Sequence, residues 1–170
     1  MIIKYNLTEE DYLKFSLFHV KNSKTHIRTI NTQRFVTPIF LIIFALLFSL
    51  IPGTYFQVLF IFTVVICIMW LIFYPKYYYY LVIRNSRKMI REGKNDGMLG
   101  EHILNLNEEG LIDTTLNGET KVNWTGIKVF KEDDDNFYLY NTSVSSYVIP
   151  KHELTNVEEI RNYIISHIKT

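Results

Sequence analysis

The chain has 170 residues, a net charge of +1 and one cysteine, Cys67, which excludes an intramolecular disulfide. The charge is unevenly placed. Residues 1–34 carry six basic and three acidic side chains, and residues 76–96 carry six basic and two acidic ones. Residues 97–170 carry six basic and twelve acidic side chains. Basic segments on both sides of the apolar middle match the anionic inner leaflet of a membrane.

The N-terminal region, residues 1–34, predicts a strand followed by an amphipathic helix. Met1–Asn6 alternates as a short strand does. Thr8-Glu9-Glu10-Asp11 has the pattern of a capping box, with a threonine cap and an acid three residues on. Apolar side chains at helical spacing then predict a helix from Glu9 to Asn31, which can run on into the apolar stretch that follows.

Residues 35–75 predict a transmembrane helical hairpin. Phe35–Ile51 and Thr54–Tyr74 are two apolar runs separated by Pro52-Gly53, and residues 38–75 contain no Asp, Glu, Lys, Arg or His. Each run approaches the roughly 20 residues that cross a bilayer core of about 30 Å. The alternative is a buried helical pair in a soluble core. Because ionisable groups are absent from both runs, we expect neither a channel nor a transporter.

Positive charge predicts the orientation of this hairpin. Lys and Arg residues flank both runs, whereas the turn between the runs is uncharged. Short flanks rich in Lys and Arg stay in the cytoplasm. We therefore expect a multi-pass protein of the cell (inner) membrane with two helices and both termini cytoplasmic.

A basic juxtamembrane helix is predicted within residues 76–96. Lys76–Arg91 has one apolar face, Gly93 and Asn95-Asp96-Gly97 follow it, and a neighbouring face holds Arg84, Arg87, Lys88 and Arg91. Such a helix can contact anionic lipid headgroups. The alternative is a topology signal with an ordinary solvated face.

From residue 97 onward the apolar period changes to two. Six short strands are expected at His102–Leu106, Gly110–Leu116, Glu119–Trp124, Ile127–Lys131, Asn136–Tyr140 and Ser146–Ile149. Their short turns, including Asn117-Gly118, favour an antiparallel meander that Pro150 ends. Thr155-Asn156-Val157-Glu158 then resembles a second capping box. A final helix with an apolar stripe at Val157, Ile160, Ile164 and Ile168 should pack on the sheet.

The predicted fold class is therefore an α+β membrane protein. Its cytoplasmic domain, residues 97–170, has the bent antiparallel sheet and C-terminal helix of a pleckstrin-homology (PH)-like arrangement. The chain resembles the YcxB-like family of bacterial membrane proteins, and the segments that carry the resemblance include Leu106-Asn107-Glu108-Glu109-Gly110, Val122-Asn123-Trp124, Phe137-Tyr138-Leu139-Tyr140 and Ile149-Pro150-Lys151. The resemblance implies this domain order and brings no established activity or catalytic residue with it.

Few residues stand out as a site. Trp124 is expected to fill one end of the core or to contact a partner, and Tyr138 and Tyr140 are further candidates for partner contact. Asp133–Asp135 lack the ligand spacing of a calcium loop and are expected to form an exposed turn. The five histidines show no metal-ligand spacing. Phosphate-loop and nucleophile motifs are absent, so we expect no enzyme activity and no cofactor.

These observations predict a non-enzymatic inner-membrane protein that displays a cytoplasmic PH-like interaction or regulatory domain. The alternatives are an anionic-lipid-sensing module and an accessory or immunity-type subunit of another membrane protein. The expected partners are the lipid bilayer and another membrane or cytoplasmic protein, or a second copy of the chain, and no nucleic acid. The sequence leaves open whether the N-terminal strand joins the distal sheet.

Overall fold

The computed structural model describes residues 1–51, 55–92 and 98–168 and has an α+β fold. The predicted turns at Pro52-Gly53 and at Gly93 and Asn95-Asp96-Gly97 lie outside these residues. The chain divides into two compact units. One unit contains Met1–His19 together with Asn85–Thr170, and the other contains Val20–Arg84.

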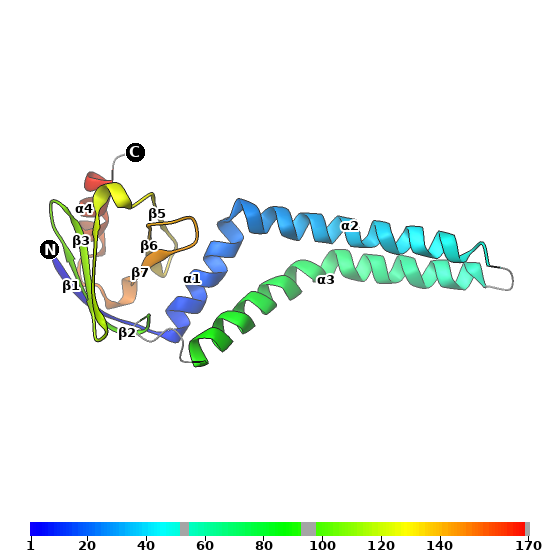
Figure 1. The fold of residues 1–170 in the computed structure, drawn as a ribbon, viewed down its shortest axis with the longest axis horizontal. Coiled ribbons are helices and arrows are strands. Elements are labelled where there is room, and N and C mark those ends of the chain that lie inside the picture. The colour runs from blue at the N-terminus through cyan, green and yellow to red at the C-terminus, as the bar shows by residue number, and fades with distance from the viewer. Residues whose placement is uncertain (52–54, 93–97, 169–170) are drawn as a thin grey trace. The chain divides into compact units, whose positions relative to one another are not determined.

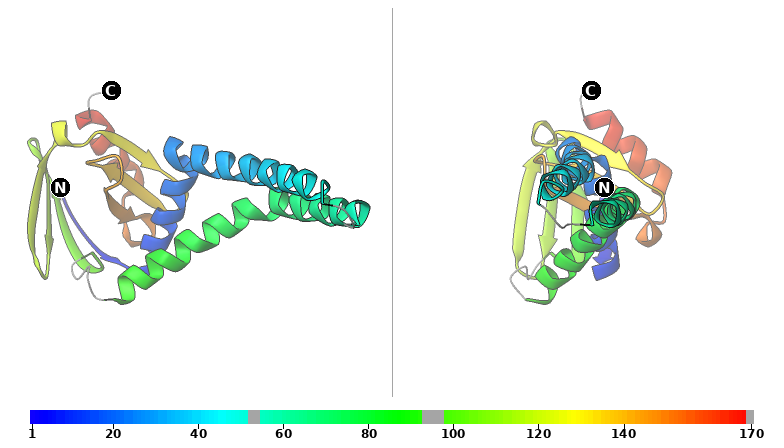
Figure 2. Two further views of the ribbon diagram at one scale, coloured as in Figure 1. Left: turned by 45° about the vertical axis from the view of Figure 1, so that its right-hand side comes forward. Right: turned by 90° about the vertical axis from the view of Figure 1, so that its right-hand side faces the viewer.

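The first unit is built on two antiparallel sheets (Figures 1 and 2). The first sheet has the order β1 (Ile2–Leu7), β2 (Gly100–Leu106), β3 (Gly110–Thr115) and β4 (Gly118–Asn123), and the second has the order β5 (Val129–Glu132), β6 (Asn136–Tyr140) and β7 (Ser146–Pro150). A short 3-10 helix, Trp124–Gly126, separates the two sheets where the sequence predicted one continuous meander. The six predicted strands are otherwise confirmed to within about two residues at each end.

Strand β1 joins the distal sheet, which answers the question that the sequence left open. It pairs antiparallel with β2, with Ile2 opposite Asn105 and Leu7 opposite Gly100. In β1 the inward positions Ile3, Tyr5 and Leu7 are buried and the intervening residues are exposed. The alternation therefore puts one face of β1 into the core.

The core contains side chains from both sheets and from α4 (Val157–His167). Its fully buried apolar members include Leu104, Leu106, Leu111, Phe137, Leu139, Ile149 and Ile164. The predicted stripe on α4 is confirmed, since Ile160 and Ile164 are buried and Val157 and Ile168 pack against the core. The predicted capping box at Thr155 is wrong. Asn156 is the N-cap, and its side-chain amide donates to Glu159 Oε2 (2.9 Å) instead of closing on the main chain.

The N-terminal capping box is confirmed at the start of α1 (Glu9–Asn22). Thr8 Oγ1 accepts from the Asp11 main-chain N–H at 3.2 Å, and Asp11 Oδ2 accepts from the Thr8 N–H at 3.2 Å. The predicted continuous helix to Asn31 is wrong at Ser23, where the backbone is extended and α2 (Lys24–Phe48) begins. Serine has a low helix propensity, and here it adopts the extended backbone of an N-cap without a side-chain capping hydrogen bond.

The second unit consists of α2 and most of α3 (Phe56–Arg91), which run side by side (Figure 1). Both helices are long and apolar enough to cross a membrane. Their outward side chains are strongly exposed, among them Phe40 (67%), Phe62 (64%) and Ile61 (63%). Continuous apolar exposure of this kind is rare on soluble monomers. Helix α3 also continues without a break through the predicted basic helix at residues 76–91.

Candidate functional site

The four basic residues predicted to contact lipid lie near the C-terminal end of α3, and all four are exposed. Arg87 Nε is 3.1 Å from Glu9 Oε1, and Lys88 Nζ is 3.6 Å from Glu92 Oε1. Arg84 and Arg91 have no ion-pair partner among the residues that the structure describes. Two of the four charges are therefore partly neutralised and two remain available at the surface.

Tyr138 and Tyr140, the predicted partner contacts on β6, are buried in the first unit, with 0% and 6% exposure. The Tyr138 hydroxyl donates to Asp133 Oδ2 at 2.7 Å, and its ring stacks on Phe18 of α1 with centroids 4.5 Å apart. Burial and the bond to Asp133 raise the pKa of Tyr138, and burial raises the pKa of Tyr140 to about 12. Their contact with a partner stays a prediction.

Asp133 closes the turn between β5 and β6. Its Oδ1 accepts from the main-chain N–H groups of Asp135 (3.0 Å) and Asn136 (2.8 Å), and its Oδ2 accepts from Tyr138. Asp135 Oδ1 is 3.3 Å from Nζ of Lys14 on α1. Asp133 and Asp135 thus stabilise a hairpin turn, and the exposed Asp134 lies in the same turn, as the sequence suggested.

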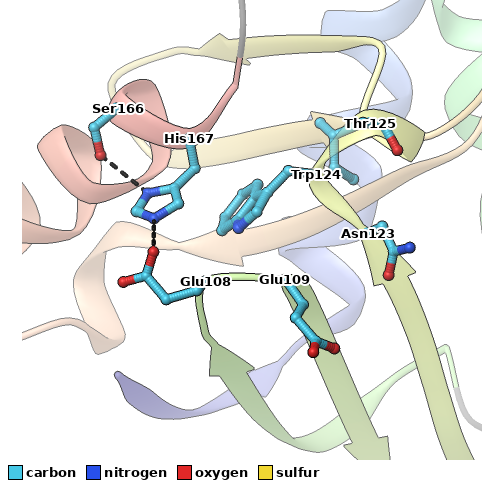
Figure 3. Close-up of a pocket in the computed structure, with 8 residues that line it drawn as sticks. Glu108, Glu109, Asn123, Trp124, Thr125, Ser166 and His167 are labelled. Atoms are coloured by element: carbon cyan, nitrogen blue, oxygen red, sulfur yellow. Dashed lines mark hydrogen bonds and ion pairs between the residues drawn. The ribbon is translucent and has the colours of Figure 1, made fainter.

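Trp124 lines a cavity that is partly open to solvent (Figure 3). Its volume is about 750 Å³. Three elements line it: the β2–β3 turn, the end of β4 with the 3-10 helix, and the C-terminal end of α4. The lining residues are Glu108, Glu109, Asn123, Trp124, Thr125, Ile127, Ser166 and His167. We call this cavity the Trp124 pocket.

The β2–β3 turn holds Trp124 in place. Asn107 Oδ1 accepts from the Glu109 and Gly110 N–H groups, both at 2.9 Å, which fixes the turn. The Asn107 carbonyl accepts from Trp124 Nε1 at 2.8 Å, and the Glu109 carbonyl accepts from the Trp124 N–H at 3.2 Å. Trp124 is 7% exposed, so it fills the end of the core and also forms a wall of the pocket.

Gly110 allows the turn to lie this close to β4. A Cβ atom at this position would be 2.1 Å from the Val122 carbonyl oxygen and 2.6 Å from Asn123 Cα, which no side chain can occupy. Residues 106–110 and 122–124, two of the segments that carry the family resemblance, therefore meet at the Trp124 pocket.

Ser166, His167 and Glu108 lie side by side in the pocket, as the members of a hydrolase triad do (Figure 3). Their hydrogen bonds, however, do not suit proton transfer from Ser166 to His167. The Tyr163 carbonyl oxygen is 2.8 Å from both Ser166 Oγ and His167 Nδ1. A carbonyl only accepts, so Ser166 can donate to it, and so can the His167 tautomer that carries its hydrogen on Nδ1. In that tautomer Nδ1 cannot take a proton from Ser166, although the two atoms are 3.0 Å apart.

The mouth of the pocket is acidic. The side chains of Glu108 and Glu109 are 92% and 73% exposed. Glu109 Oε2 is 3.2 Å from Lys121 Nζ, and Glu108 Oε2 is 3.4 Å from His167 Nε2. Burial and the charge of Glu108 raise the pKa of Tyr163, whose ring stacks on His167 with centroids 4.4 Å apart.

A second polar cluster, which the sequence did not reveal, lies inside the same unit. His102 Nδ1 is 3.0 Å and 3.1 Å from the two oxygens of Asp113, and the residues are only 6% and 7% exposed. Tyr5 stacks on the imidazole with centroids 5.1 Å apart, and His102 Nε2 has no partner among the described residues. The inward positions of β2 and β3 could have indicated the pair, but only with the register known.

Comparison with known proteins gives one match. Neither the curated proteins nor the solved structures contain a significant match to the chain. Residues 106–164, from the end of β2 to Ile164 in α4, match the family model described as YcxB-like protein, which confirms the resemblance over that segment.

Proposed function

We propose that the chain is a bacterial inner-membrane protein that displays a PH-like interaction domain on the cytoplasmic side. Its work would be binding or regulation, without catalysis. The observation that carries the proposal is the pairing of β1 with β2, because two helices apolar enough to cross a membrane lie between these strands in the sequence.

The strand pairing limits the topology. β1 precedes α2 and β2 follows α3, yet the strands form one ladder from Ile2–Asn105 to Leu7–Gly100. Both ends of the hairpin must therefore lie on the same side of any membrane that it crosses, which requires an even number of crossings. The Lys- and Arg-rich flanks favour the cytoplasm for that side.

The architecture of the first unit supports a PH-like domain. Four strands and three strands form two sheets, and a C-terminal helix packs its apolar stripe on their common core. The Trp124 pocket supports binding over catalysis, since the Tyr163 carbonyl, 2.8 Å from Ser166 Oγ, competes with His167 Nδ1 for the Ser166 hydrogen.

Cysteine labelling tests the topology. With Cys67→Ser as background, Tyr55→Cys and Leu116→Cys place single thiols at residues that are 86% and 90% exposed. A membrane-impermeant maleimide should label the Tyr55→Cys protein in intact spheroplasts and the Leu116→Cys protein only after lysis. Labelling of the Leu116→Cys protein in intact spheroplasts, or release of the protein by alkaline carbonate, would overturn the proposal.

Anionic-lipid sensing is the second candidate, and the exposed Arg84 and Arg91 favour it. The full chain would be compared in nanodiscs with and without phosphatidylglycerol. If lipid sensing is the function, replacement of Arg84, Arg87, Lys88 and Arg91 by Gln should abolish a lipid-dependent change in amide exchange at α3. An accessory role through the hairpin would instead give crosslinks from Gln57 in α3 to another membrane protein.

A further inference from the structure

We propose that the Trp124 pocket receives a Lys or Arg side chain from an extended segment of a partner protein, and that this segment pairs with the free edge of β4. The inference rests on the proposed interaction function and names the chemistry of the partner. Three features of the first unit lead to it: an open strand edge, an acidic mouth, and an aromatic wall.

The open edge is β4, which is the last strand of the first sheet. It pairs with β3 from Gly110–Asn123 to Thr115–Gly118 and with no other strand among the described residues. Glu119, Thr120 and Lys121 in its middle are exposed. Unpaired main-chain groups on such an edge can bind an extended peptide by strand addition. Since β4 ends at Asn123 in the pocket wall, an added strand would lead directly to the pocket.

The charge at the mouth selects a cation. Glu108 and Glu109 bring two carboxylates to the pocket, with Lys121 Nζ 3.2 Å from Glu109 Oε2 and the His167 imidazole 3.4 Å from Glu108 Oε2. The surrounding chain strengthens this field, because residues 97–170 contain twelve acidic and six basic side chains. A carboxylate or phosphate group on a partner would meet like charge here, whereas Lys or Arg would meet its complement.

The walls suit the shape of a long basic side chain. The Trp124 ring lies beside His167, with ring centroids 5.2 Å apart (Figure 3), and Ile127 adds an apolar surface. The aliphatic stem of Lys or Arg can cover these groups while its charged head stays at the wet mouth near Glu108. A cation near the face of an indole ring is attracted by the ring's electrons. The volume of about 750 Å³ leaves room for the neighbouring residues of the segment.

Fluorescence of the full chain in nanodiscs tests the assignment. Trp70→Phe leaves Trp124 as the only indole, since the chain has two tryptophans. The probes are blocked heptapeptides, Ser-Thr-Val-X-Val-Thr-Ser, with X as Lys, Arg, Gln or Glu. The Lys and Arg peptides should change the Trp124 emission saturably, and the Gln peptide should bind roughly fivefold more weakly, the loss of about one exposed ion pair.

Two variants and one modified peptide locate the contact. The double variant Glu108→Gln with Glu109→Gln should bind the Lys peptide roughly tenfold more weakly and should no longer prefer the Lys peptide to the Gln peptide. Asp134→Asn removes one exposed acid in the β5–β6 turn away from the pocket; it is the control for loss of a surface carboxylate and should leave binding unchanged. N-methylation of the peptide main chain should abolish binding, because it removes the hydrogen-bond donors of an added strand.

The assignment is overturned if the Lys, Gln and Glu peptides bind equally, if Asp134→Asn weakens binding as much as the double variant, or if no peptide alters the emission. The cysteine labelling above does not depend on the pocket. Correct labelling together with failed peptide binding would therefore remove this assignment and leave the proposed topology in place.

Discussion

Arg34 donates a hydrogen bond from Nε to the main-chain carbonyl of Leu71, 2.8 Å away. Leu71 lies four residues before Pro75, which is inside α3 and has no N–H to offer to that carbonyl. The guanidinium of α2 thus replaces the hydrogen bond that proline removes from α3. Nearby, Trp70 Nε1 donates to the Gln33 carbonyl at 3.3 Å, so the same region has a reciprocal bond between the helices.

Replacing Arg34 should therefore destabilise the helix pair, and the effect should depend on Pro75. In the Arg34→Met protein the Leu71 carbonyl loses a charged donor, so we expect a loss of about 1.5–3 kcal/mol in the free energy of unfolding. In the Pro75→Ala background the restored N–H satisfies this carbonyl, and Arg34→Met should cost clearly less. Unfolding of all four proteins in nanodiscs, followed by circular dichroism, gives the coupling energy. If Arg34→Met costs the same free energy of unfolding in both backgrounds, Arg34 does not replace the hydrogen bond that Pro75 removes.

The buried pair of His102 and Asp113 predicts a different pattern. Removal of one partner, as in Asp113→Ala, leaves the other polar group buried without compensation and should cost roughly 3–5 kcal/mol. The double replacement His102→Phe with Asp113→Leu removes both polar groups and keeps a ring against Tyr5. We expect it to lie within about 1–2 kcal/mol of the unmodified chain. Urea unfolding followed by tryptophan emission measures both, and a double variant at least as unstable as Asp113→Ala would refute the pairing.

Glu132 predicts how stability depends on pH. Burial alone would raise the pKa of Glu132, but hydrogen bonds from Arg161 and Lys151 outweigh burial and lower it below 4.5. Lys151 Nζ is 2.7 Å from Oε2 and Arg161 Nη2 is 2.9 Å from Oε2. The lowered folded pKa means that this group stabilises the fold above about pH 4.5 and that the contribution disappears as the pH falls further.

The variant Glu132→Gln should be less stable at pH 7 by about 0.5–1 kcal/mol, as for a partly exposed ion pair, and should lose less stability than the unmodified chain below pH 4.5. Urea titrations at pH 7, 4.5 and 3 measure this. Asp134→Asn is the control. If Glu132→Gln and Asp134→Asn give the same pH profile, the ion pairs do not contribute.

Gly110 predicts a steric effect at the Trp124 pocket. The Gly110→Ala Cβ would lie 2.1 Å from the Val122 carbonyl oxygen, so β4 must move away and we expect a loss of more than about 3 kcal/mol. Gly118→Ala is the comparison, because its Cβ meets nothing within 4 Å and costs only the strain of φ +150°, about 1–2 kcal/mol. Chemical unfolding followed by Trp124 emission separates the two variants. Equal losses would show that the contact with Val122 does not matter.

Local sequence patterns predicted most helices and strands of the fold, but they did not predict which strands pair over long sequence separations. The period of two located β2, whose buried residues His102, Leu104 and Leu106 alternate with less buried ones, although β4 is largely exposed and β6 is buried at every position. The break at Ser23 was missed because apolar residues keep a helical spacing across it. The ladder between Ile2 and Asn105 could not be predicted, since pairing over such a separation leaves no mark in either segment.

The candidate site was predictable only in part, for the same reason. Trp124 stood out as a large aromatic residue at the end of a strand, and it does line a cavity. Glu108 and His167 are 59 residues apart in the sequence and approach only when α4 packs over the β2–β3 turn. His102 and Asp113 likewise meet through the register that places Leu104 opposite Asp113.

The position of β1 has a consequence for biogenesis. During synthesis Ile2 leaves the ribosome long before its partner Asn105, and all of α2 and α3 is made in between. The first sheet therefore remains unfinished until both helices have been made, and β1 stays unpaired until β2 is made about a hundred residues later. In timed translation reactions, protease resistance of the first unit would thus appear only after both helices have been made. Folding of this sheet therefore depends on completed synthesis of the hairpin.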